Sequence, residues 1–311
     1  MKSYVELLNQ IDRGEGASKE TRAPFFLFAL YLVSFFLHLP SRIPILGVIR
    51  FDFILVGLLT FFIFSTKYGK ETRFDDASKY LLIILVYSLI SIPFVEWPGS
   101  VLHNGVSEFI KAAIFYFFTV SLVISEARIK LVVLIFVVCN LIRVVEPLYL
   151  NLTEGYLGGV THLGGGEFAG RLSGAPSDVV NPNGLAFIIA TIFPFLHYVF
   201  SPTSKKALFF YIMLVPVLIY TMGLTLSRSG VLALGIIGVG IWLKSTRKFR
   251  LLIFGLIGFI LVITNLSEIQ KDRYLSIVSD DARQSATADG RIEGWSEDFK
   301  VAMNRPIIGH G

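Results

Sequence analysis

Long apolar runs separated by short polar connections make up most of the chain. A membrane-spanning helix needs about 20 mostly apolar residues, because no backbone group can stay unpaired in hydrocarbon. Nine runs approach or reach this length, at residues 24–39, 51–66, 79–95, 106–124, 128–148, 182–200, 207–226, 229–243 and 250–266. This pattern predicts an all-α polytopic membrane protein with about nine transmembrane helices.

The polar ends of the chain and the apolar region between them predict three parts. Residues 1–23 are polar and carry no signal-peptide pattern, so we expect the first span to be retained. Residues 24–266 form the predicted transmembrane domain, and residues 267–311 are polar again. Nine spans place this last segment on the opposite side of the membrane from the N-terminus.

The basic residues in the connections predict the orientation. The N-terminal segment and every second connection after it carry sixteen Lys and Arg residues. The other short connections carry four, which are Arg42, Arg50, Arg171 and Arg228. Because loops rich in Lys and Arg stay in the cytoplasm, we expect a cytoplasmic N-terminus and an extracytoplasmic segment at 267–311.

Composition agrees with a membrane protein and removes other classes. The 311 residues are 54% hydrophobic and 16% charged, with a mean hydropathy of +0.68, whereas soluble domains are about 45–50% apolar and about 25% charged. The net charge of +5 comes from residues that flank apolar runs, so we expect no nucleic-acid partner. A single cysteine, Cys139, excludes an intrachain disulfide and a cysteine-based metal site.

Charged residues inside membrane spans are costly and indicate function by default. Five occur, in the outer parts of their helices in this orientation: Asp52, Glu108, Lys111, Arg143 and Glu146. Glu108 with Lys111, and Arg143 with Glu146, are spaced to share a helix face, so one interpretation is two self-neutralising pairs near the headgroups. The other is that all five line a net-cationic, outward-opening cavity suited to an anionic headgroup.

The first outward motif lies in the glycine-rich connection 151–181. It runs from Gly170-Arg171-Leu172-Ser173-Gly174 into Asn181-Pro182-Asn183-Gly184. Asn181 is the predicted N-cap of the next helix, with proline at the first helical position. By spacing alone, this stretch is a flexible loop followed by a capped helix.

The second outward motif, Thr225-Leu226-Ser227-Arg228-Ser229-Gly230, predicts a tight hairpin between two spans. Arg228 is either a snorkelling anchor or a ligand for an anion. Its small polar neighbours leave room for the guanidinium to meet a ligand.

The third motif is Asp289-Gly290-Arg291-Ile292-Glu293-Gly294-Trp295, whose apolar residues continue at helical spacing to Met303. Asp289 is the predicted N-cap, which puts Arg291 in the first helical turn. A cation is unfavourable there unless an anion docks at the helix start. The alternative is an exposed arginine on a surface helix.

Together the three motifs, followed by Arg305-Pro306-Ile307-Ile308-Gly309-His310-Gly311, resemble the O-antigen ligase and polymerase family over roughly residues 165–311. Each motif is short, and the resemblance rests on their order, spacing and outward topology. The earlier spans match only in being hydrophobic.

The resemblance implies a glycosyltransferase of the bacterial inner membrane, with residues 267–311 in the periplasm. Such an enzyme moves a glycan from undecaprenyl pyrophosphate to a lipid or sugar hydroxyl, as in lipopolysaccharide and other surface polysaccharides. The resemblance implies no cofactor and no metal. By matching motifs, Arg228 and Arg291 are the catalytic, pyrophosphate-binding residues, and Arg171 is a third candidate ligand.

The resemblance also implies a histidine base in a large periplasmic loop, followed by closing spans. Neither is found before Gly311, so we expect the sequence to be truncated at its C-terminus. His310 lies in the glycine pattern at a position that the family does not use for catalysis, and His38, His103 and His197 have the character of interfacial or packing residues.

Two other function classes stay open at this stage. A polytopic transporter or lipid flippase also places charges along a pathway, although it should carry them near the midplane or on both sides. A non-catalytic scaffold would tolerate loss of all three arginines. Within the family, the sequence does not separate a ligase from a polymerase.

Overall fold

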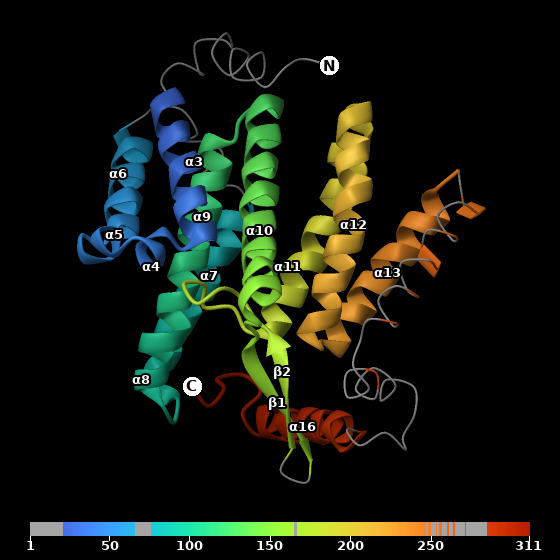
Figure 1. Ribbon diagram of the computed structural model, residues 1–311. Helices are drawn as coiled ribbons and strands as arrows, with labels where there is room; N and C mark the ends of the chain where they lie inside the picture. The colour runs from blue at the N-terminus through green and yellow to red at the C-terminus, as the bar shows by residue number, and fades with distance from the viewer. Residues whose placement is uncertain are drawn as a thin grey trace. The chain divides into compact units, whose positions relative to one another are not determined.

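The computed structural model describes residues 21–65, 76–164, 167–246 and 285–311, with a few isolated positions between 248 and 271. In these ranges the chain is helical except for one two-stranded hairpin and short connections (Figure 1). The longer helices are α3 (Arg22–Leu37), α6 (Phe51–Ser65), α7 (Asp76–Ser91), α9 (Ser107–Leu122), α10 (Glu126–Glu154), α11 (Pro182–Phe195), α12 (Lys205–Thr225), α13 (Arg228–Lys244) and α16 (Ser285–Asn304).

The helices confirm an α-helical polytopic membrane protein. Five helical stretches in the described ranges are long and apolar enough to cross a membrane: Asp76–Phe94, Pro98–Leu122, Glu126–Glu154, Pro182–Thr203 and Lys205–Thr225. Two shorter apolar helices, α3 and α6, coincide with the first two predicted runs. The ninth predicted span, 250–266, and residues 1–20 lie outside the described residues, so the predicted total of nine spans stays a prediction.

The chain forms two compact units, and both α3 and α10 contribute to each. The first unit takes Val33–Ile49 and the chain from Val133 to Ala288, and the second takes the chain up to Leu32, Arg50–Val132 and Asp289–Gly311.

The core of the first unit lies where α11 packs against α12 and α13 and against the second half of α10. Leu185, Ile189, Ile192 and Leu218 are completely buried there. Asn181 is the N-cap of α11 and accepts a hydrogen bond from the Gly184 amide at 2.8 Å, which confirms that predicted helix start. Large apolar side chains also stay exposed on the outer surfaces of the helices, as Phe187 and Ile236 do at 70% and 73%. Such surfaces are typical of helices that face lipid.

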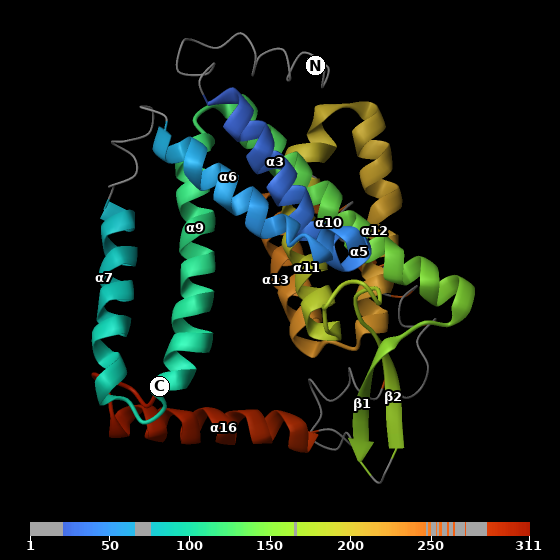
Figure 2. The same ribbon diagram turned by 90° about the vertical axis from the view of Figure 1, so that its left-hand side faces the viewer.

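In the second unit, α7 and α9 lie side by side and α16 runs across one end of both (Figure 2). The segment after α16 is attached to the connection that follows α7. Glu96 and Trp97 donate backbone hydrogen bonds to the carbonyl of His310, and Arg305 forms an ion pair with Glu96 at 3.1 Å.

The glycine-rich connection contains structure that the sequence did not predict. Residues Gly158–Gly164 (β1) and Glu167–Leu172 (β2) pair as an antiparallel hairpin, with Gly158 opposite Leu172. The prediction of a flexible loop was therefore wrong for most of this connection. Its glycines serve close packing, because a Cβ at Gly159 would lie 2.7 Å from Cγ of Pro182 at the start of α11.

Candidate functional site

The turn that carries Arg228 is held rigidly between α12 and α13. Leu226, the C-cap of α12, is completely buried and has a left-handed backbone with φ 52°. The next residue, Ser227, is the N-cap of α13 and accepts a hydrogen bond from the Gly230 amide at 3.3 Å. Arg228 is consequently the first residue of α13, and it is half-buried. The predicted tight hairpin is confirmed, with its arginine at a helix N-terminus.

Arg171 joins this turn to the start of α11. Its Nε donates to the carbonyl oxygen of Thr225 at 2.8 Å, and its Nη2 donates to Oδ1 of Asn183 at 2.7 Å. The side chain is buried, with 8% of the residue exposed. The structure therefore brings Arg171 and the turn of Arg228 together, with the Arg171 guanidinium bound to groups of the protein on two sides.

Arg291 lies at a different helical position from the one predicted. Helix α16 begins at Ser285, so Asp289 is not its N-cap and Arg291 is not in its first turn. Ser285, Ala286, Thr287 and Ala288 extend the helix upstream, because serine and threonine cost little in a helix and alanine favours it most. The argument for an anion at the helix start therefore no longer applies to Arg291. Its side chain lies outside the described residues.

The intramembrane charges pair differently in the two units. In the second unit, Lys111 and Glu108 form the expected pair within α9. In the first unit, Arg143 and Glu146 each take a partner from another segment, so the expected pairing of these two residues was wrong. Arg143 binds Asp178, and Glu146 binds Arg42, with a 2.6 Å contact between Oε2 and Nη2.

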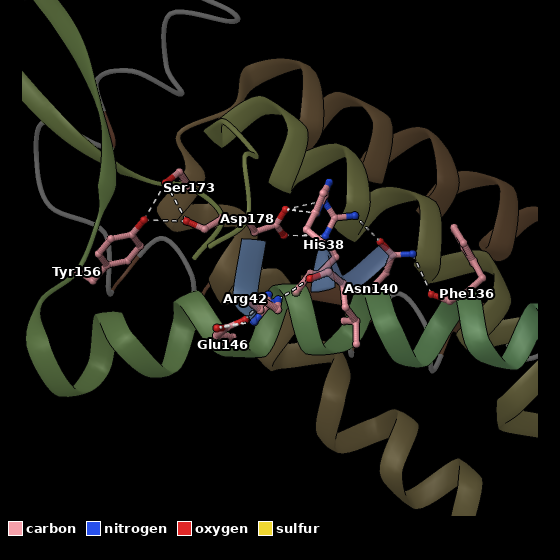
Figure 3. Close-up of polar contacts among 11 residues, drawn as sticks. His38, Arg42, Phe136, Asn140, Glu146, Tyr156, Ser173 and Asp178 are labelled. Atoms are coloured by element: carbon pink, nitrogen blue, oxygen red, sulfur yellow. Dashed lines mark hydrogen bonds and ion pairs between the residues drawn. The ribbon is translucent and has the colours of Figure 1, made fainter. Parts of the chain in front are cut away.

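Asp178 is the centre of a buried polar cluster. Arg143 donates to it from two nitrogens, Nε to Oδ2 at 2.7 Å and Nη2 to Oδ1 at 3.0 Å. Nδ1 of His38 lies 3.0 Å from Oδ1 (Figure 3). Asn140 accepts a further hydrogen bond from Nη1 of Arg143 at 3.2 Å. The carboxylate itself has no exposed surface, whereas the His38 side chain is 37% exposed.

The electrostatic result is a carboxylate that stays ionised well below its ordinary pKa. Burial by itself would raise the pKa of Asp178, but the hydrogen bonds and the positive charges of His38 and Arg143 outweigh it and lower the pKa to about 2. Arg143 with Asp178, and Arg42 with Glu146, pair opposite charges. These four side chains therefore add no net positive charge to the expected cationic cavity.

Two neighbours fix the loop that presents Asp178. The Gly174 amide donates to the carbonyl of Val180 at 2.8 Å and closes the loop. Oη of Tyr156 donates to the Gly174 carbonyl at 2.8 Å and lies 3.4 Å from Oγ of Ser173 (Figure 3). These contacts close the loop that carries Asp178 and connect its beginning to Tyr156.

Sequence reasoning did not predict the roles of Asp178 and His38. One signal was present: a buried arginine such as Arg143 needs an anionic partner, and Asp178 is one of two acidic residues between Gly155 and Asn181. Nothing in the sequence pointed to His38, which is 140 positions away from Asp178. Within the described ranges, no three His, Cys, Asp or Glu side chains lie close enough together to hold a metal ion.

The second and third motifs lie in a range of the chain that matches a known protein family. The family model described as O-antigen ligase matches residues 208–311, a range that contains both Arg228 and Arg291. This match confirms the resemblance to the O-antigen ligase family. It supports an O-antigen ligase-type membrane enzyme of polysaccharide biosynthesis, with transferase activity and with lipid-linked glycans and membrane lipid as partners. No curated protein and no solved structure matches the chain significantly.

Proposed function

We propose that this O-antigen ligase-type protein transfers a glycan from undecaprenyl pyrophosphate to a lipid or sugar hydroxyl at the outer face of the bacterial inner membrane. The observation that carries the proposal is the position of Arg228, half-buried at the first residue of α13 on a rigid turn. The orientation rests on the distribution of Lys and Arg, which puts this turn on the outer side.

The chemistry of the reaction requires a fixed positive charge. Transfer breaks the bond between the anomeric carbon and the pyrophosphate oxygen, so negative charge grows on the leaving pyrophosphate. A guanidinium is always charged and pairs with phosphate through two parallel hydrogen bonds. Charge that is fixed before the reaction stabilises the transition state without reorganisation. Arg228 has this character, since its backbone is held by the caps of two helices.

The other two arginines enter the proposal on different grounds. Arg171 supplies positive charge beneath the turn through its bond to the Thr225 carbonyl. Arg291 is included by its family motif alone, since its helical position no longer supports it. In this proposal both bind the pyrophosphate, and Arg228 and Arg291 act on the leaving group.

Binding of undecaprenyl pyrophosphate to the purified full chain tests the proposal. We expect Arg228→Ala to weaken binding by about 10- to 100-fold, the value of a hydrogen bond to a charged group, and Arg228→Lys to recover part of it. Lys244→Ala is the matched control, because Lys244 ends the same helix on the opposite side. If Arg228→Ala and Arg291→Ala both bind the lipid as the wild type does, the proposed arginine site is wrong.

A further inference from the structure

The His38 imidazole faces a buried carboxylate, with its Nδ1 3.0 Å from Oδ1 of Asp178. Asp178 is completely buried and is anchored by two hydrogen bonds from Arg143, itself bonded to Asn140. Removing such charges from water is expensive, and an apolar replacement is often as stable. The cluster therefore does more than a packed apolar core would, and its one exposed member is His38.

The backbone conformation of His38 also indicates a functional position. His38 has φ 50°, in the left-handed region that a residue with a Cβ rarely adopts. It precedes the short helix α4 (Leu39–Arg42) without capping it through its side chain. Arg42, at the end of α4, is tied to Glu146 of α10. Strain that is maintained by surrounding contacts is typical of functional positions.

The pairing also sets the chemistry of the ring. Asp178 is ionised, so it can only accept, and the Nδ1 that faces it must carry the proton. Nε2, the other ring nitrogen, is then the atom through which the ring can bond a ligand. Among the described residues, none is bonded to Nε2.

We propose that His38 is a saccharide-binding residue, whose Nε2 forms a hydrogen bond with a sugar hydroxyl of the lipid-linked glycan, with Asp178 as its positioning residue. This inference rests on the proposed function. A glycan offers many hydroxyls, each of which can donate or accept a hydrogen bond, and a ring nitrogen that points in a set direction selects among them. His38 is connected to the proposed donor site through the chain before α11, because Asp178 lies three positions before the N-cap of that helix and Asn183 in its first turn binds Arg171.

Two substitutions separate recognition from a merely structural role. His38→Asn places an amide nitrogen where Nδ1 was, so it keeps the contact to Asp178, and asparagine tolerates the left-handed backbone. His38→Gln instead extends an amide towards the former Nε2. We expect His38→Asn to be as stable as the wild type and to lose glycan recognition, and His38→Gln to recover part of it. His103→Asn, at an exposed histidine in the second unit, is the control.

The experiment compares two probes on the full chain: lipid-linked glycan from the producing cells, and undecaprenyl pyrophosphate without a glycan. We expect His38→Asn to weaken binding of the first by roughly threefold to tenfold, as for a neutral hydrogen bond, and to leave the second unchanged. Arg228→Ala should weaken both. The inference is wrong if His38→Asn binds the glycan-bearing probe as tightly as the wild type does. It is also wrong if His38→Asn loses the same affinity for both probes. If the wild type binds neither probe, both the proposed function and this inference fail.

Discussion

At the scale of the residue, the partner of Arg143 decides which other segments the outer half of α10 is connected to. The spacing of Arg143 and Glu146 favours a local pair, which would leave α10 independent of its neighbours. Instead Arg143 binds the loop before α11, and Glu146 binds the segment after α3. Two ion pairs thereby connect three segments that are distant in the sequence, and one of them holds the buried carboxylate of Asp178.

The carboxylate of Asp178 predicts how stability depends on pH. Its pKa in the fold, about 2, lies below its ordinary value, so its contribution is fully present above that ordinary value. It is lost as pH falls from about 5 towards 2, and it amounts to about 2 kcal/mol. We expect the unfolding temperature of the detergent-solubilised chain to drop between pH 5 and pH 3. Asp178→Asn should be less stable at pH 7 and should show a smaller drop. An equal drop in both proteins would contradict the assignment to this residue.

At the scale of the element, the close approach of α13 to α11 and α12 positions the turn of Arg228. A Cβ at Gly230 would lie 2.5 Å from Cβ of Ala186 and 2.9 Å from Sδ of Met222. Only a glycine allows this contact, and it lies two residues after Arg228 in the first turn of α13. The placement of the arginine therefore depends on packing between helices as well as on the caps of the turn.

Gly230→Ala is expected to lower stability by about 1–3 kcal/mol, the usual cost of overpacking, and to weaken binding of undecaprenyl pyrophosphate because Arg228 shifts. Gly238→Ala is the matched control on the same helix, since a Cβ there meets nothing within 4 Å. Thermal unfolding and lipid binding of the two variants check this. Unchanged stability and binding in Gly230→Ala would show that α13 lies less close to α11 and α12 than in this structure.

At the scale of the whole molecule, the orientation in the membrane determines which substrates reach Arg228. Two helix ends give a direct readout, because Glu154 ends α10 and Thr203 ends the helical stretch that begins at Pro182. Both residues are exposed. The distribution of Lys and Arg predicts that Glu154 is extracytoplasmic and Thr203 cytoplasmic.

Single-cysteine variants test this orientation in a Cys139→Ala background, since Cys139 is the chain's one cysteine. A membrane-impermeant maleimide applied to intact spheroplasts should label Glu154→Cys. It should label Thr203→Cys only after the membrane is permeabilised. The reverse pattern would place the turn of Arg228 in the cytoplasm and exclude a donor that is presented from the outer leaflet.

The sequence by itself determined the α-helical membrane class, the positions of the described apolar helices, the capped start of α11 and the family resemblance. These features are local: hydropathy adds up along a stretch, and a cap or a short motif involves neighbouring residues. The β1–β2 hairpin escaped prediction because its glycines carry little strand propensity and are needed for close packing. The start of α16 was predicted wrongly because Asp289 is a plausible N-cap, although the residues before it also form a helix well.

Only the tertiary structure decided which charges meet. The contact between His38 and Asp178, the anchoring of Asp178 by Arg143, and the bond from Arg171 to the Thr225 carbonyl all join residues far apart in the sequence. Spacing along one helix constrains neighbours three or four positions away, but it carries no information about which loop covers the end of that helix. The partner of a buried charge is set by packing in three dimensions, and here that packing places a histidine with no sequence signal against a buried carboxylate.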